Sequence, residues 1–182
     1  DQPVWDGRVG DALAQFLGGR TGLATRDGVP YDIGGRVRTE AGGLPFDPVL
    51  GMIGVSYGGE VQFATASFGR VDTIVPQITW NDLSYSLAPS NTGQLRAGDD
   101  PRSVSAPTGV SKIGWTSLFF ALGLTQDLSN QRPQDLLTQL TSANACPNFD
   151  PGACTAILDL ASDGAPSPAT IAFARGASVA AY

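Results

Sequence analysis

Residues 49–78 are VLGMIGVSYGGEVQFATASFGRVDTIVPQI, and this stretch decides the fold prediction. The apolar run 49–55 is typical of a strand that is buried on both faces of a parallel sheet. The segment after Ser56 predicts a helix with small residues near its start and an end at Gly69, and a second apolar run follows at 71–78. Strand, helix and strand in this order predict a βαβ unit and therefore an α/β fold.

The turn between the first strand and the helix carries a G-x-S-x-G pattern, Gly54-Val55-Ser56-Tyr57-Gly58. In this context the pattern is typical of a nucleophile elbow, a tight turn that projects a serine hydroxyl into a cleft. The two glycines would keep the turn free of clashes, and the helix N-terminus would offer N–H groups to a developing oxyanion. We predict Ser56 as the nucleophile and the backbone N–H of Tyr57 as an oxyanion donor. The alternative is a simple turn in which Ser56 only caps the helix.

The composition bounds the possible classes of function. With 182 residues, 42% of them hydrophobic, the chain is about one ordinary domain and can bury a core. Its 11 basic and 17 acidic residues give a net charge of −6, which argues against a nucleic-acid partner. The chain has no histidine, so it cannot hold a complete Ser-His-Asp triad or a histidine-ligated zinc site. We expect no metal and no cofactor.

A serine nucleophile needs a base, and the chain offers only poor ones. Asp82, just past the second strand, is the carboxylate best placed to approach Ser56, but a carboxylate with a pKa of about 4 is a weak base for a serine proton. Lys112, the only lysine, makes a Ser–Lys pair formally possible, although a solvated side chain is the expected state. The other candidate carboxylates are Asp72, Asp99 and Asp100.

Residues 51–89, GMIGVSYGGEVQFATASFGRVDTIVPQITWNDLSYSLAP, resemble the X-prolyl dipeptidyl peptidase and cocaine-esterase-like acyl hydrolases. The similarity lies in G-x-S-Y-G-G, in R-V-D-x-I-V-P and in W-N-D-L. It implies a partial α/β-hydrolase fold, with Ser56 as the acyl-accepting nucleophile and Tyr57 as a backbone oxyanion donor. It also implies that Trp80, Asn81 and Asp82 lie at the substrate cleft. The family's catalytic Asp and His come on strands after the cap, and we expect them outside this chain.

The sequence predicts two regions. Residues 1–89 are expected to form the α/β-hydrolase core segment, with a helix at residues 5–17 and a long Gly-rich loop at 18–48 that has room for a short hairpin. Residues 90–182 are expected to form a mostly helical, cap-like region after a polar connector. Its helix signals lie in the segments 114–124, 132–143, 150–162 and 167–182.

The two cysteines, Cys146 and Cys154, flank a short loop that contains proline and glycine. We predict a local disulfide, which implies an oxidising compartment, and the alternative is two unrelated buried thiols. The chain opens with the polar DQPVWDGR, so no signal peptide is expected in it, and no apolar run is long enough to span a membrane. The prediction is a secreted or cell-envelope protein, and the excess of Arg over Lys with abundant Ala and Gly hints at a bacterial source.

Two parallel strands with apolar residues on both faces cannot form a stable sheet alone. We therefore expect a companion polypeptide segment or chain that completes the sheet and supplies the missing His and acidic residue. The predicted function is a serine acyl hydrolase that cleaves a small ester, amide or peptide through an acyl-enzyme at Ser56. The alternative is a non-catalytic α/β-hydrolase-like subunit for binding or assembly.

Overall fold

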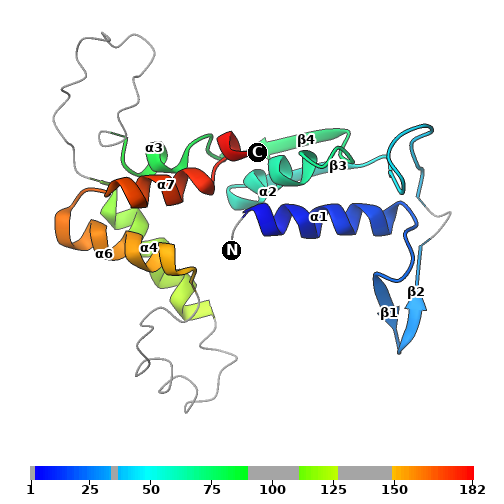
Figure 1. Cartoon of the computed structure of the whole chain (residues 1–182), viewed down its shortest axis with the longest axis horizontal. Helices are drawn as coiled ribbons and strands as arrows, with labels where there is room; N and C mark the ends of the chain where they lie inside the picture. The colour runs from blue at the N-terminus through cyan, green and yellow to red at the C-terminus, as the bar shows by residue number, and fades with distance from the viewer. Residues whose placement is uncertain (1–2, 34–36, 90–110, 127–148) are drawn as a thin grey trace, which may run out of the picture. The chain divides into compact units, whose positions relative to one another are not determined.

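The computed structural model describes residues 3–33, 37–89, 111–126 and 149–182 of a mixed α/β chain (Figure 1). The chain divides into two compact units. The first consists of Asp1–Asn81 together with the last six residues, Ala177–Tyr182, and the second is Asp82–Gly176. The boundary between residues 89 and 90 that the sequence suggests stays a prediction.

The first unit is built around the predicted βαβ motif. Strand β3 (Gly51–Val55) leads into helix α2 (Tyr57–Ala66), which returns to strand β4 (Thr73–Gln77). The strands are parallel and in register from Gly51 opposite Thr73 to Val55 opposite Gln77, which confirms the strand, helix and strand order. The unit also contains α1 (Pro3–Leu17), the antiparallel hairpin β1 (Ala24–Arg26) and β2 (Val29–Tyr31), and η1 (Val179–Ala181).

Helix α2 packs against the two strands on one side and against α1 on the other (Figure 1). The contact between the helices is made by small residues. A Cβ atom on Gly7 would lie 2.9 Å from Ala64, and one on Gly10 would overlap the Thr65 side chain. Because α1 turns small residues toward α2, three of its large apolar residues are left exposed: Trp5 by 60%, Val9 by 67% and Leu13 by 56%.

The sheet formed by β3 and β4 is covered by α2 on one face only. Among the described residues these strands pair only with each other. On the uncovered face Ile53 is 73% exposed, Val55 51% and Val75 48%. Within the described residues no element packs on the second face, so burial of β3 on both faces stays a prediction that depends on the expected companion segment. We call Ile53, Val55 and Val75 the bare sheet face.

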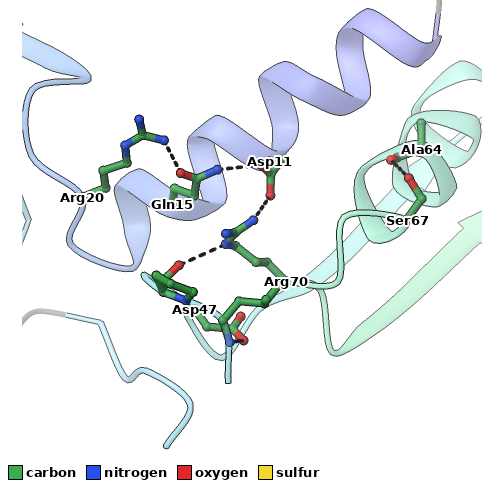
Figure 2. Close-up of polar contacts among 9 residues, drawn as sticks. Asp11, Gln15, Arg20, Asp47, Ala64, Ser67 and Arg70 are labelled. Carbon is green, nitrogen blue, oxygen red and sulfur yellow. Dashed lines mark hydrogen bonds and ion pairs between the residues drawn. The ribbon is translucent and has the colours of Figure 1, made fainter. Parts of the chain in front are cut away.

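Arg70, which follows α2, ties the loop before β3 to α1 (Figure 2). Its guanidinium forms an ion pair with Asp11 at 2.5 Å, with both side chains largely buried. Its Nε donates to the Pro45 carbonyl at 3.3 Å. Asp11 also accepts a hydrogen bond from Gln15 at 2.6 Å. This network gives the buried charges of α1 and Arg70 the pairing that buried ions need.

The described part of the second unit is helical. It contains α3 (Leu83–Leu87), α4 (Ile113–Gln126), α6 (Pro151–Asp163) and α7 (Pro168–Gly176). Two of the predicted helix starts are confirmed, because Asp150 accepts from Gly152 N at 2.8 Å and Ser167 Oγ accepts from Thr170 N at 3.2 Å. The polar connector and the helix expected at 132–143 lie outside the described residues.

Candidate active site

Ser56 occupies the turn between β3 and α2 in a strained backbone conformation. Its φ is 55° and its ψ is −120°, a left-handed value that a non-glycine residue adopts only when its surroundings force it. The backbone N–H of Ser56 donates to the Gln77 carbonyl at 2.9 Å, which fixes the turn to the end of β4. The residue is exposed, and its hydroxyl makes no capping hydrogen bond to α2. The simple helix-capping alternative is therefore not what the structure shows.

Two glycines make this turn sterically possible. A Cβ on Gly54 would lie 2.6 Å from the carbonyl oxygen of Gly58, and one on Gly59 would lie 2.9 Å from Thr79 Cβ. A Cβ on Gly58 would meet no other atom within 4 Å. The prediction for Gly54 is confirmed. The prediction for Gly58 is wrong, because Gly59 is the residue that faces the end of β4.

The first turn of α2 directs backbone N–H groups toward the region of Ser56. The first intrahelical bonds run from Gly59 N and Glu60 N to the Ser56 carbonyl, at 2.9 Å and 3.2 Å. The N–H groups of Tyr57 and Gly58 come before these bonds in the helix, where orphan donors and the positive end of the dipole favour an anion. The Tyr57 N–H thus belongs to the first turn of α2, and its role as an oxyanion donor stays a prediction.

The side chain of Gln62 lies directly beneath the turn. It is 1% exposed, and its Nε2 donates to the carbonyls of Gly58 at 2.9 Å and Gly54 at 3.3 Å. Its Oε1 accepts from the N–H of Val75 at 3.0 Å. One amide thus joins both strands to the first turn of α2.

A cluster of acids and phenols lies at the first turn of α2, and of its members Glu60 is the buried one. The phenol of Tyr57 donates to the Asp6 carboxylate. Glu60 is fully buried, with Oε2 3.4 Å from Thr79 Oγ1, and its Oε1 finds no hydrogen-bond partner among the residues that the structure describes. Burial raises the pKa of Glu60 to about 7, against opposing hydrogen bonds from Thr79 and Tyr182. Burial also raises the pKa of both phenols above the usual range.

Trp80 and Asn81, two of the predicted cleft residues, contact the C-terminal segment of the chain. The indole N–H of Trp80 donates to the Ala177 carbonyl at 2.9 Å. The carbonyl of Asn81 accepts from Ala180 N at 3.2 Å, and the residue itself is exposed. Trp80 is half-buried. Their predicted role in binding substrate stays a prediction.

The structure gives Asp82 a structural role that the sequence did not suggest. Its buried carboxylate caps α3 by accepting from Tyr85 N at 3.1 Å, and it accepts from Ser84 Oγ at 2.5 Å. It also forms an ion pair with Arg175 at 3.2 Å. The carboxylate is engaged in this way within the second unit, and its predicted approach to Ser56 stays a prediction.

The remaining candidate bases also have other roles or lie outside the description. Asp72 accepts from Leu50 N at 2.7 Å at the start of β3, which is the opposite end of the strand from Ser56. Lys112 is exposed just before α4, in agreement with the solvated reading. Asp99 and Asp100 lie outside the described residues.

Of the predicted disulfide, the structure describes one end. Cys154 lies on α6 and is disulfide-bonded. Cys146 lies outside the described residues, so the pairing stays a prediction. In the described ranges no three His, Cys, Asp or Glu side chains gather as a metal site would require. No helix within the same ranges has the length and apolar character needed to cross a membrane.

Comparison with known proteins gives no further guide to the site. No protein-family model, no curated protein and no solved structure matches this chain. The candidate site therefore depends on its own geometry. Sequence reasoning missed the buried Glu60 and Gln62, and the signal that could have identified them is the pair of polar residues in the helix that directly follows the Ser56 turn.

Proposed function

We propose that this chain carries the nucleophile of a serine acyl hydrolase with an α/β-hydrolase core. The observation that supports this proposal is the backbone of Ser56. A strained serine between a parallel strand and a helix, with its hydroxyl not used as a cap, is the arrangement that a nucleophile elbow requires. Strain of this kind costs of order 1–3 kcal/mol, and it persists only where the surrounding structure holds it.

In the proposed reaction Ser56 Oγ attacks the carbonyl carbon of an ester or amide. The serine proton passes to an imidazole base, and the new oxyanion accepts a hydrogen bond from the Tyr57 N–H. Collapse of the tetrahedral intermediate breaks the bond to the alcohol or amine, which takes the proton from the imidazolium. Water then hydrolyses the acyl-enzyme and restores the Ser56 hydroxyl.

The chain has no histidine, so we propose that a companion polypeptide segment supplies the imidazole and its acidic partner. The bare sheet face supports this part of the proposal. Ile53, Val55 and Val75 are exposed apolar residues on strands that have only each other as described partners. A sheet of this kind gains stability when further strands and an apolar layer cover it. The disulfide at Cys154 supports a secreted or cell-envelope location.

The same bare face favours a second candidate function. A subunit that keeps the turn for packing alone would serve in binding or assembly, with no chemistry at Ser56. The two candidates differ in one property. Only the hydrolase needs an imidazole within hydrogen-bond reach of Ser56 in the assembled molecule.

The test is fluorophosphonate labelling of the native, unfractionated protein, with a mass readout of the labelled peptide. Labelling at Ser56 that is lost in Ser56→Ala supports the hydrolase. The matched control is Ser67→Ala, since Ser67 lies at the other end of α2 and its hydroxyl donates to the Ala64 carbonyl at 2.7 Å (Figure 2). If the protein is folded and Ser56 is not labelled, the hydrolase proposal is overturned and the assembly subunit remains as the candidate function.

A further inference from the structure

The amide of Gln62 makes three hydrogen bonds to the backbone around the Ser56 turn. Its Nε2 donates to the Gly58 and Gly54 carbonyls, and its Oε1 accepts from Val75 N. The partners determine the orientation of this amide, because two carbonyls require the NH₂ group and one N–H requires the oxygen. No ionised glutamate, aliphatic or thioether side chain of similar length can satisfy all three.

The bonds of Gln62 come in addition to the pairing of the two strands. In a parallel pair the hydrogen bonds are slanted, so each residue bonds to the neighbours of the residue opposite it. At this end of the sheet the Ser56 N–H donates to the Gln77 carbonyl at 2.9 Å. Gln62 adds a bond to the Gly54 carbonyl at 3.3 Å and one to the Val75 N–H at 3.0 Å. Its amide is therefore a side-chain link from α2 to both strands, close to the strained serine.

The packing around Gln62 is tight as well as polar. A Cβ on Gly54 would lie 2.9 Å from Gln62 Nε2, and the side chain is 1% exposed. The β3 end of the turn and the first turn of α2 are thus held against one amide. These two segments flank Ser56 on either side, so their separation determines the conformation that Ser56 must adopt.

We infer that Gln62 is the positioning residue of the turn and that its amide holds Ser56 in the strained conformation by bridging Gly54, Gly58 and Val75. Its catalytic meaning depends on the proposed hydrolase function, whereas its structural effect on the turn does not. Without the amide, the side-chain bonds to the Gly54 and Gly58 carbonyls and to the Val75 N–H are lost. The turn can then relax, and the Ser56 hydroxyl leaves the position that a nucleophile needs.

The test compares Gln62→Met and Gln62→Glu with the wild-type chain. Hydrogen exchange of the Ser56 and Val75 amides reports the turn, and the rate of fluorophosphonate labelling in the native assembly reports the serine. We expect exchange at both amides to rise about tenfold, as the loss of one or two net hydrogen bonds predicts, and labelling to slow by at least as much. Amides in the middle of α1 should exchange at the wild-type rate.

A control variant makes the experiment decisive. Gln77→Met changes an exposed glutamine at the end of β4 and should leave both readouts unchanged. Wild-type exchange at Ser56 in Gln62→Met would overturn the inference. Faster exchange at Ser56 in Gln62→Met, together with a wild-type chain that is never labelled, would support the inference and reject the hydrolase.

Discussion

The phenol of Tyr57 donates a hydrogen bond to the carboxylate of Asp6, which joins the residue after Ser56 to the first turns of α1. The two residues are 51 positions apart in the chain, so this bond is a tertiary link that involves the turn itself. The side chain of Tyr57 therefore has a structural role, while its backbone N–H remains the proposed oxyanion donor.

Tyr57→Phe should separate these two roles. Loss of a hydrogen bond to a charged group is expected to lower the free energy of unfolding by about 1.5–3 kcal/mol. The backbone N–H is retained. At temperatures below the melting temperature, the rate of fluorophosphonate labelling should therefore change less than about threefold, which corresponds to a few tenths of a kcal/mol in the activation free energy. Urea unfolding and labelling of the same preparation check both values. A stable variant that has lost labelling would show that the phenol itself takes part in the chemistry.

Glu60 should make stability depend on pH. Its pKa is raised from 4.5 to about 7 in the folded chain, so the folded state holds a proton that the unfolded state releases. The stabilisation is fully present below pH 4.5 and is lost as pH rises through about 7, which amounts to about 3 kcal/mol over this range. Glu60→Gln should remove this part of the pH dependence.

Melting temperatures at several pH values between 4 and 8 measure this effect, with Glu40→Gln as the control because Glu40 is exposed. The difference between Glu60→Gln and the wild type should grow with pH and level off above 7. A constant difference at all pH values would mean that Glu60 has the same pKa in both states.

Alanine at the three glycines of the turn should give a distinct order of stability. Gly54→Ala and Gly59→Ala place a Cβ against backbone or against Thr79, and each is expected to cost about 1–3 kcal/mol. Gly58→Ala meets open space and lies in a helix, where alanine is favoured over glycine by about 1 kcal/mol. Chemical denaturation of the three variants ranks them. Equal losses for all three would contradict the steric account of the turn.

Asp82→Ala should destabilise the second unit without slowing the serine. The change removes the α3 cap and the ion pair with Arg175, for an expected loss of about 1–3 kcal/mol. Labelling of Ser56 should continue at the wild-type rate in the folded protein. The matched control is Asp163→Ala at the end of α6. This change removes an exposed carboxylate and should leave the free energy of unfolding unchanged. Labelling lost in a folded Asp82→Ala protein would restore Asp82 as a partner of Ser56.

The bare sheet face can be tested by Ile53→Thr. Since Ile53 is 73% exposed and threonine suits a strand, the change should alter the stability of the chain alone by no more than about 0.5 kcal/mol. In the native assembly the same change should weaken binding of the companion segment and reduce labelling at Ser56. Size-exclusion chromatography and labelling report these outcomes. Strong destabilisation of the chain alone would mean that Ile53 is covered within this polypeptide.

The local structure around Ser56 could be predicted from the sequence because its signals are local. Two apolar runs, a helix-length segment and glycines at fixed spacing identify a strand, turn and helix without reference to the rest of the chain. The Asp150-Pro151 and Ser167-Pro168 starts of α6 and α7 were predictable for the same reason.

The remaining features depend on tertiary packing, which local patterns do not encode. An apolar stripe on α1 indicates a face that can be buried, but the glycines opposite it make a closer contact with α2, so Trp5 and Leu13 remain exposed. Asp82 follows β4 in the sequence, yet its carboxylate is used by α3 and Arg175. Gln62 gains its role only because α2 packs on both strands, where its amide bonds to Gly54 in β3 and Val75 in β4.

The chain leaves the first unit at Asn81 and returns to it at Ala177. The two crossing points are neighbours, since Trp80 bonds to Ala177 and Asn81 bonds to Ala180. Residues 82–176 are thus an insertion in the first unit, and the two ends of the insertion are attached to the first unit at neighbouring positions. An insertion of this kind can be lengthened, shortened or exchanged without altering the path of the first unit, so the Ser56 turn can stay constant while residues 82–176 change.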